Sequence, residues 1–175
     1  MQRFPISYTS LVEAPILELM DDGDRVWQTL AYRADFVLPQ LEEMGWGNVA
    51  GELVWINDAT YQGLQLDGKI AVRVPSRSLD QEAAVAQAHG AAGLIVVGKI
   101  AGEKRPWAKQ ALPVTVPVSK TIPVLELTRP GYERLLDAVG RTDNALLGAP
   151  PALPLDMQAR IGIRLSTPEP REAVN

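Results

Sequence analysis

The chain contains no cysteine among its 175 residues and a single histidine, His89. Without cysteine there is no disulfide, no thiolate nucleophile and no cysteine-ligated zinc or iron–sulfur centre in this chain. One histidine is too few for the several imidazole and carboxylate ligands that converge in a two-metal hydrolase. We therefore expect no metal site and no cofactor in this chain.

Long runs of basic or of apolar residues are also missing. The net charge of −4 and the pI near 5.1 disfavour nucleic-acid binding, because such binding depends on Lys and Arg side chains that neutralise the phosphates. No apolar run approaches the roughly 20 residues that span a bilayer, so we expect no membrane span. The opening MQRFPISYTS has no signal-peptide pattern. The compartment stays open, and a secreted or cell-envelope location would require a signal outside this sequence.

What is present is an ordinary globular composition, 46% hydrophobic and 22% charged, which suits one domain spanning residues 1–175. Its first third consists of short β-prone runs. Ile16–Met20 and residues 26–32 flank DDGD, whose Asp and Gly residues favour a hairpin turn. Residues 52–56 form another predicted strand. The preceding GWGNVAG (residues 45–51) is interpreted as a flexible turn, because its glycine spacing does not fit a dinucleotide-binding loop.

A strand–helix–strand unit follows. Residues 69–74 predict a buried strand, and Ser78 with Gln81 has the spacing of a capping box at a helix start. Gly90 is the predicted helix stop, and GLIVV after it is typical of a strand covered on both faces. The two strands should therefore be parallel. The expected packing face of the helix is Ala84, Val85 and Ala88. Asp80 and Glu82 place negative charge in the first turn, where the helix dipole stabilises it.

The remainder alternates loops with two regular elements and a closing strand. Residues 99–121 form a predicted surface loop rich in Pro and Lys, with a short strand near 114–118. IPVLELT predicts a strand, and RPGYERLLDAVG predicts a helix with Pro130 in its first turn and Gly140 after its end. Residues 144–156 are expected to be irregular, and residues 157–167 alternate as a half-exposed strand.

Candidate catalytic groups do not combine into a recognisable motif. His89 falls in the last turn of the predicted helix, where an imidazole can bind free carbonyl groups, and we interpret it as structural. None of the serines lies in a G-x-S-x-G elbow. The paired acids are interpreted as solvated turn charges; these are Asp21, Asp22, Glu42 and Glu43. We predict no catalytic residue.

Several motifs together resemble the protease-associated domain. They are Gly68-Lys69-Ile70, then Ala86/Gly90/Ala91/Gly93 around the end of the first helix, then Ile122-Pro123-Val124. The resemblance covers residues 66–140. YRADFVLP before it resembles the lead-in of such domains inserted in two-zinc aminopeptidases, and TPEPREAVN resembles the segment where the peptidase chain resumes.

The resemblance implies a mixed α/β fold, a three-layer β/β/α swivelling-type domain with a β–α–β unit. Two main helices would lie on one side of the sheet and additional antiparallel strands on the other. Residues 1–65 would be a strand-rich lead-in, and residues 141–175 a closing strand and linker to a peptidase domain. The implied function is a non-catalytic module of a larger zinc peptidase, which modulates substrate access or binds peptide. Its partners would be the catalytic domain in cis and a peptide or protein substrate; only the parent would bind zinc.

Two other functions are weighed against this one. A stand-alone protein-interaction domain would use the loop 99–121, where Trp107 and Arg105 have the residue types of binding hot spots, with Trp46 as a weaker candidate. Alternatively, Trp107 packs inward and merely anchors that loop. The least favoured function is a small serine-type hydrolase that uses His89 with a nearby serine.

Overall fold

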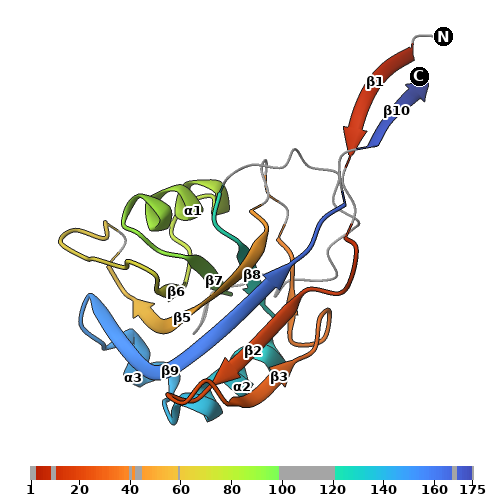
Figure 1. Ribbon diagram of the computed structural model, residues 1–175. Coiled ribbons are helices and arrows are strands. Elements are labelled where there is room, and N and C mark those ends of the chain that lie inside the picture. The colour runs from red at the N-terminus through yellow and green to blue at the C-terminus, as the bar shows by residue number, and fades with distance from the viewer. Residues whose placement is uncertain are drawn as a thin grey trace.

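Eight strands of the computed structural model form one curled, mixed sheet, in the order β3-β2-β9-β5-β6-β7-β8-β4 (Figure 1). The structure describes residues 3–8, 11–39, 41, 45–58, 60–98, 121–166 and 169–174. The mixed α/β class predicted from the sequence is confirmed. The strands of the sheet are β2 (Ile16–Met20), β3 (Val26–Leu30), β4 (Phe36–Val37), β5 (Gly47–Ile56), β6 (Ile70–Arg73), β7 (Gly93–Val97), β8 (Val124–Leu127) and β9 (Ala152–Ile163). The described helices are α1 (Leu79–Ala88), α2 (Arg129–Val139) and α3 (Asp143–Leu147).

The predicted hairpin is present. β2 and β3 pair in antiparallel orientation, and Asp21 closes the turn between them. Its Oδ1 accepts the backbone N–H groups of Gly23 and Arg25, each at 3.0 Å. The interpretation of Asp21 as a turn residue is therefore confirmed, whereas Glu42 and Glu43 lie outside the described residues.

The predicted strand–helix–strand unit is also present, as β6, α1 and β7. β6 and β7 are parallel, and the parallel pairing continues to β5 on one side and to β8 on the other. The Ser78 hydroxyl caps α1 by accepting the N–H of Gln81 at 3.4 Å. Gly90, with φ of +87°, turns the chain away from the helix, a conformation that costs glycine little.

Two sequence interpretations are wrong in the outer strands. Residues 47–51 are not a flexible turn but the first half of β5, because they pair with the long strand β9. Residues 144–156 are not irregular. They hold most of α3, which is capped by the Thr142 hydroxyl, and the first residues of β9.

Apolar side chains cover both faces of the central strands β5–β8. Successive side chains of a strand point to opposite faces, and here they enter two separate cores. One core holds Ala83 and Ala86 of α1, and the other holds Tyr132 and Leu135 of α2. The two long helices thus cover opposite faces of β5–β8 instead of sharing one side, because both faces are apolar.

The helices themselves differ from expectation in one further respect. The buried residues of α1 are Glu82, Ala83 and Ala86; of the predicted packing face, Val85 is partly buried against the core, whereas Ala84 and Ala88 are exposed. Within the described residues, no helix combines the length and the apolarity that crossing a membrane requires.

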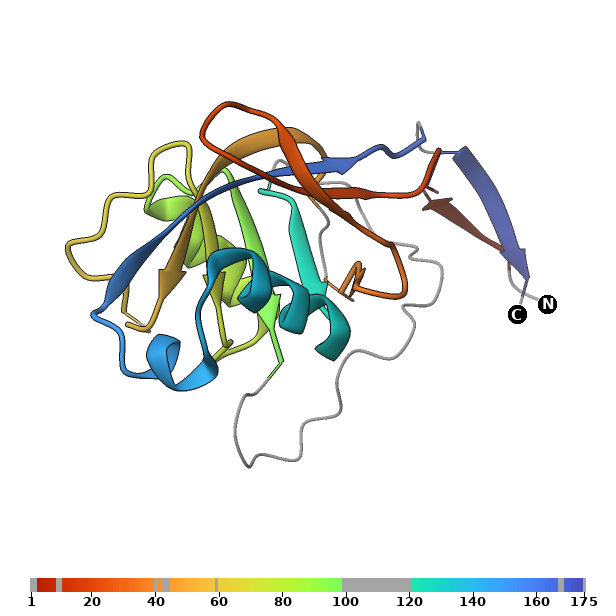
Figure 2. The ribbon, with the colours of Figure 1, turned by 90° about the horizontal axis from the view of Figure 1, so that it is seen from below.

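A separate two-stranded ribbon projects from the body of the molecule (Figures 1 and 2). It consists of β1 (Arg3–Tyr8) and β10 (Glu169–Val174), paired antiparallel from Arg3↔Val174 to Tyr8↔Glu169. An isolated bridge between Leu11 and Leu165 continues the pairing toward the sheet. The first and last described strands therefore run side by side.

Candidate functional site

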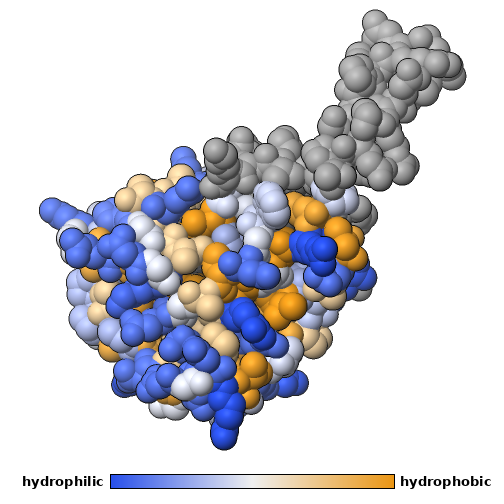
Figure 3. Space-filling model, viewed as in Figure 1, coloured by the Kyte–Doolittle hydropathy of each residue, from blue (hydrophilic) through white to orange (hydrophobic). Residues whose placement is uncertain are grey.

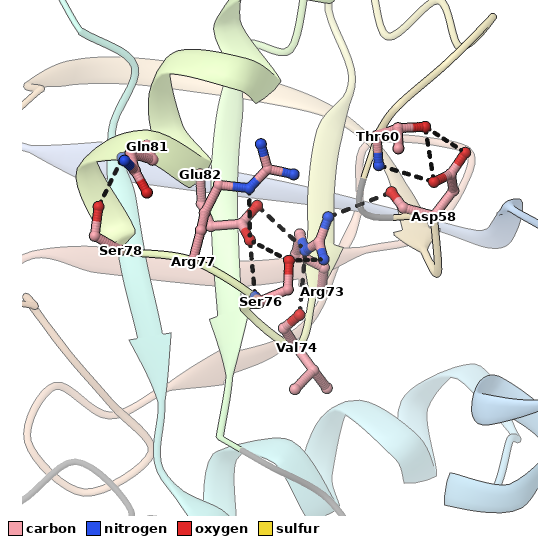
Figure 4. Close-up of polar contacts among 9 residues, drawn as sticks. All are labelled: Asp58, Thr60, Arg73, Val74, Ser76, Arg77, Ser78, Gln81 and Glu82. Atoms are coloured by element: carbon pink, nitrogen blue, oxygen red, sulfur yellow. Dashed lines mark hydrogen bonds and ion pairs between the residues drawn. The ribbon is translucent and has the colours of Figure 1, made fainter.

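A group of polar side chains surrounds a buried ion pair between β6 and α1 (Figure 4). Arg73 at the end of β6 is 2% exposed and Glu82 in the first turn of α1 is 0% exposed. Arg73 Nε lies 3.3 Å from Glu82 Oε2. The other carboxylate oxygen, Oε1, accepts the backbone N–H of Ser76 at 2.9 Å and its hydroxyl at 3.2 Å.

The guanidinium group of Arg73 is bound on several sides. It donates to the carbonyl of Val74 at 3.1 Å, to the carbonyl of Asp58 at 3.3 Å and to the hydroxyl of Ser76 at 3.2 Å. A second arginine, Arg77, approaches Glu82 Oε1 to 3.4 Å from the partly exposed side. A buried charge is costly unless it is paired and hydrogen-bonded. The guanidinium and the carboxylate oxygen Oε1 meet both conditions, whereas Oε2 has the ion pair with Arg73 but no hydrogen bond.

The aromatic ring of Tyr61 extends this group toward His89. The Arg73 guanidinium lies 5.3 Å from the ring centre of Tyr61, and the His89 ring stacks on Tyr61 at 5.6 Å. His89 Nδ1 lies 3.1 Å from the carbonyl oxygen of Leu64. Burial raises the pKa of Tyr61 above its ordinary value of 10.0, and this effect outweighs the nearby positive charge of Arg73.

These contacts hold the crossover in place. The Arg73–Glu82 pair connects β6 to α1, and the contact of His89 with Leu64 connects the end of α1 to the loop before β6. The side chains of His89, Tyr61 and Arg73 therefore each contact another residue of the fold. The arrangement favours a structural role for His89, as interpreted from the sequence, although the carbonyl it contacts belongs to a loop and not to its own helix.

The sequence did not indicate Glu82 as a member of this group. An acidic residue in the first turn of a helix is usually solvated, where it interacts with the helix dipole. From the sequence alone, Glu82 is therefore interpreted as such a residue. The one available signal was Arg73 within an otherwise apolar strand, since a buried arginine needs a carboxylate partner.

A surface pocket of about 270 Å³ contains Trp46, one of the three residues predicted to bind a partner. The start of β2, the start of β5 and the end of β9 meet there. Gly47 leaves open space in its wall, and Glu13 and Arg164 bring opposite charges to its rim, 3.8 Å apart. The complete lining is Glu13, Ala14, Ile16, Trp46, Gly47, Asn48, Gly162, Ile163 and Arg164.

Exposed apolar side chains gather around the same pocket. Trp46 is 54% exposed, Ile16 39% and Val12 54%. Val12 lies beside the pocket because its N–H donates to the carbonyl of Arg164 at 3.0 Å. On the face shown in Figure 3, apolar side chains gather over β2 and β9, beside the segment that leads to the ribbon. We call Val12, Ile16 and Trp46 with the pocket the Trp46 surface.

The other two predicted binding residues, Arg105 and Trp107, lie outside the described residues, as does the short strand expected near 114–118. Within the part of the chain that the structure describes, no three His, Asp or Glu side chains are grouped as metal ligands.

The lead-in YRADFVLP is tied to the start of α2. Asp35 is 3% exposed, and its carboxylate accepts the N–H of Ala31 at 2.8 Å and meets Arg134 Nε at 3.2 Å. The Asp35 carbonyl accepts the N–H of Thr128 at 2.9 Å. Gly131 passes so closely that a Cβ atom there would lie 1.8 Å from this carbonyl oxygen.

Comparisons with known proteins identify no family. No family model and no curated protein matches the chain. Among solved structures, the chain is similar to the psychrophilic subtilisin-like protease Apa1 from the Antarctic psychrotroph Pseudoalteromonas sp. AS-11. The identity is 14%, the TM-score 0.42, and the match covers 91% of this chain and 36% of that one. This chain therefore spans about a third of that protease, and a likeness at this level carries no argument about function.

Proposed function

We propose that this chain is a protease-associated module, a non-catalytic accessory domain that a larger zinc peptidase carries beside its active site. On this proposal the fold departs from the three-layer β/β/α swivelling arrangement in the place of α2, which covers the face of the sheet opposite to α1. The β6–α1–β7 crossover supports it, because the motif glycines Gly68 and Gly90 lie at its turns with positive φ, and Gly93 begins β7. A Cβ atom at position 90 would lie 2.4 Å from Asp67 Oδ1, so this turn has little room for a side chain.

The observation that carries the proposal is the pairing of β1 with β10. Because these strands are antiparallel and in register, the two connections to the domain run side by side. Such a paired stalk suits a module attached at both ends to one host domain. A module held in this way can border the host's active site without supplying a reacting group.

The Trp46 surface lies at the base of this stalk, which is where a host domain would approach. Glu13 and Arg164 on the pocket rim are a few residues from the strands of the ribbon. A tryptophan beside a small pocket with polar groups on its rim has the anatomy of a binding hot spot. We therefore assign the Trp46 surface to the peptidase domain in cis, with an apolar side chain of that domain in the pocket.

The first test is the reading frame around this segment and the activity of its product. The proposal expects peptidase metal ligands encoded in the same frame, and no aminopeptidase turnover by the isolated chain with added zinc. Zinc-dependent turnover by the isolated chain would overturn it, as would a frame without any peptidase domain.

The second test uses the whole protein with Trp46→Ala. We expect the variant to fold, because Trp46 is 54% exposed. We also expect limited proteolysis to release the module at least about fivefold faster, since losing a hot-spot contact costs about 1–2 kcal/mol. Leu147→Ala, at an apolar side chain of α3 that is 44% exposed, is the control and should leave the release rate unchanged.

The alternative, a stand-alone interaction domain built on Arg105 and Trp107, stays a prediction with its own test. Trp107→Ala that abolishes binding and leaves the melting temperature unchanged would favour a contact role. Trp107→Ala that melts the domain would favour an anchoring role.

A further inference from the structure

The two edge strands of the sheet differ in their exposure to solvent. β4 stands at one edge, and both of its residues are buried. β3 stands at the other edge, and within it Val26 is 40% exposed and Trp27 52% exposed. The far side of β3 has no strand partner among the described residues. An edge strand directs alternate backbone N–H and C=O groups away from the sheet.

The sequence of this edge does not discourage pairing. Natural edge strands are commonly protected by Lys, Asp, Glu or Pro, and β3 reads VWQTL with none of these. The register shift between Leu19 and Met20 places an extra residue of β3 at Trp27. Such a bulge re-aims a side chain, in this case an exposed tryptophan. A bulge and a short strand also make an edge less regular for a partner, so any pairing at β3 is weak.

The charges at the two ends of β3 are opposite. Asp22 and Asp24 belong to the turn before the strand, and Arg33 follows its end. The backbone of Arg33 is left-handed, with φ of +69°, and its exposed side chain lies 5.5 Å above the ring of Tyr32. A parallel neighbour would place acid against acid. An antiparallel copy of the same strand places acid against base at both ends.

We propose that β3 pairs with β3 of a second copy of this chain, antiparallel and centred on Gln28. In that register Val26 lies opposite Leu30, and Trp27 lies opposite Thr29 of the second copy. Beyond the paired strands, Arg33 lies at the end of the interface where the turn with Asp22 and Asp24 of the second copy lies. Each copy therefore contributes one Trp–Thr contact and one cluster of opposite charges, as a two-fold interface requires. This inference does not depend on the proposed function.

A five-residue strand forms a small interface, so the pairing is weak. It covers less than the standard interface of about 1,600 Å². We expect a dimer that is populated at about 1 mM and largely dissociated at about 10 μM. Association will therefore be visible only across a concentration series.

Sedimentation velocity on the whole chain between those concentrations tests the proposal. Thr29→Lys places two lysines near each other across the two-fold axis and should weaken association at least tenfold. Thr29 is exposed, so the circular dichroism melt should not change. Arg141→Glu, at an exposed arginine after α2, is the control and should not alter association.

A charge exchange distinguishes a second copy from any other extended partner. Arg33→Glu and Asp22→Lys should each weaken association about three- to tenfold, and the double variant should restore it to within about twofold of wild type. Hydrogen exchange should slow at Val26–Leu30 at the high concentration. A chain that stays monomeric at 1 mM would overturn the proposal. So would a dimer that is insensitive to Thr29→Lys, or a double variant without recovery.

Discussion

Arg73 and Glu82 form a buried ion pair that joins the last residue of β6 to the first turn of α1, with 3.3 Å between Nε and Oε2. Both side chains are almost wholly withdrawn from water, and Ser76 binds the free side of the carboxylate. The pair thus holds the crossover at its start, where the chain leaves the sheet for the helix.

Glu82→Gln should destabilise the fold strongly. Glutamine has nearly the same side-chain volume, and its amide oxygen can still accept the hydrogen bonds from Ser76. However, it leaves the charge of Arg73 buried without its counter-ion. Removing one member of a buried pair costs about 3–5 kcal/mol, which urea unfolding will measure. Glu133→Gln, in the exposed pair with Arg129, should cost no more than about 0.5 kcal/mol. Equal losses in the two variants would contradict the structural role of the buried pair.

Gly131→Ala should also destabilise the fold. Within a helix, alanine is favoured over glycine by about 1 kcal/mol, but here the new Cβ would lie 1.8 Å from the Asp35 carbonyl oxygen. Overpacking of this kind typically costs 1–3 kcal/mol, so the clash outweighs the helix preference. Gly23→Ala, whose new Cβ would meet nothing closer than 3.4 Å, is the control for thermal melts. A Gly131→Ala variant at least as stable as wild type would show that α2 can shift away.

The Tyr61 hydroxyl should make the stability fall at alkaline pH. The folded pKa of Tyr61 is raised by burial above the ordinary 10.0. As the pH rises, the unfolded chain therefore loses the Tyr61 hydroxyl proton before the folded chain does. The free energy of unfolding is unaffected below about pH 10 and declines above it. Tyr61→Phe removes that decline. The difference in unfolding free energy between wild type and Tyr61→Phe, measured from pH 8 to 11, should be constant up to about pH 9.5. Above that pH it should shift in favour of the variant; a flat difference would refute the prediction.

His89→Gln should be tolerated. The glutamine amide can donate to the Leu64 carbonyl in place of Nδ1–H, so the variant loses mainly the ring contact with Tyr61. We expect a cost below about 1 kcal/mol in a denaturant titration. His89→Ala, which leaves the carbonyl without this donor, should cost more. A loss of binding or activity in His89→Gln with the fold intact would instead assign the imidazole a functional role.

Local patterns were sufficient for the regular elements of the crossover and the hairpin. Ser78, Gly90 and the DDGD turn act on their immediate neighbours, so their effects can be predicted from sequence spacing alone. Pairing with β9 could not be predicted in this way. It turned the glycine-rich residues 47–51 into a strand, because backbone hydrogen bonds from a distant partner outweigh weak local preferences.

The candidate sites show the same division. Trp46 could be selected from its residue type, but its pocket requires residues 13, 14, 16, 46–48 and 162–164, which the fold brings together. Glu82 carried no local sign of burial, because its partner lies on the preceding strand.

From the order of residues alone follow the mixed α/β class, the parallel crossover and the helix caps. All of these depend on spacing within a few residues or within one motif. The tertiary structure decided which charges are buried, which glycines admit no side chain, which strand stands at the edge of the described sheet, and how β1 meets β10. These properties depend on contacts between distant segments, whose geometry no short stretch of the chain contains.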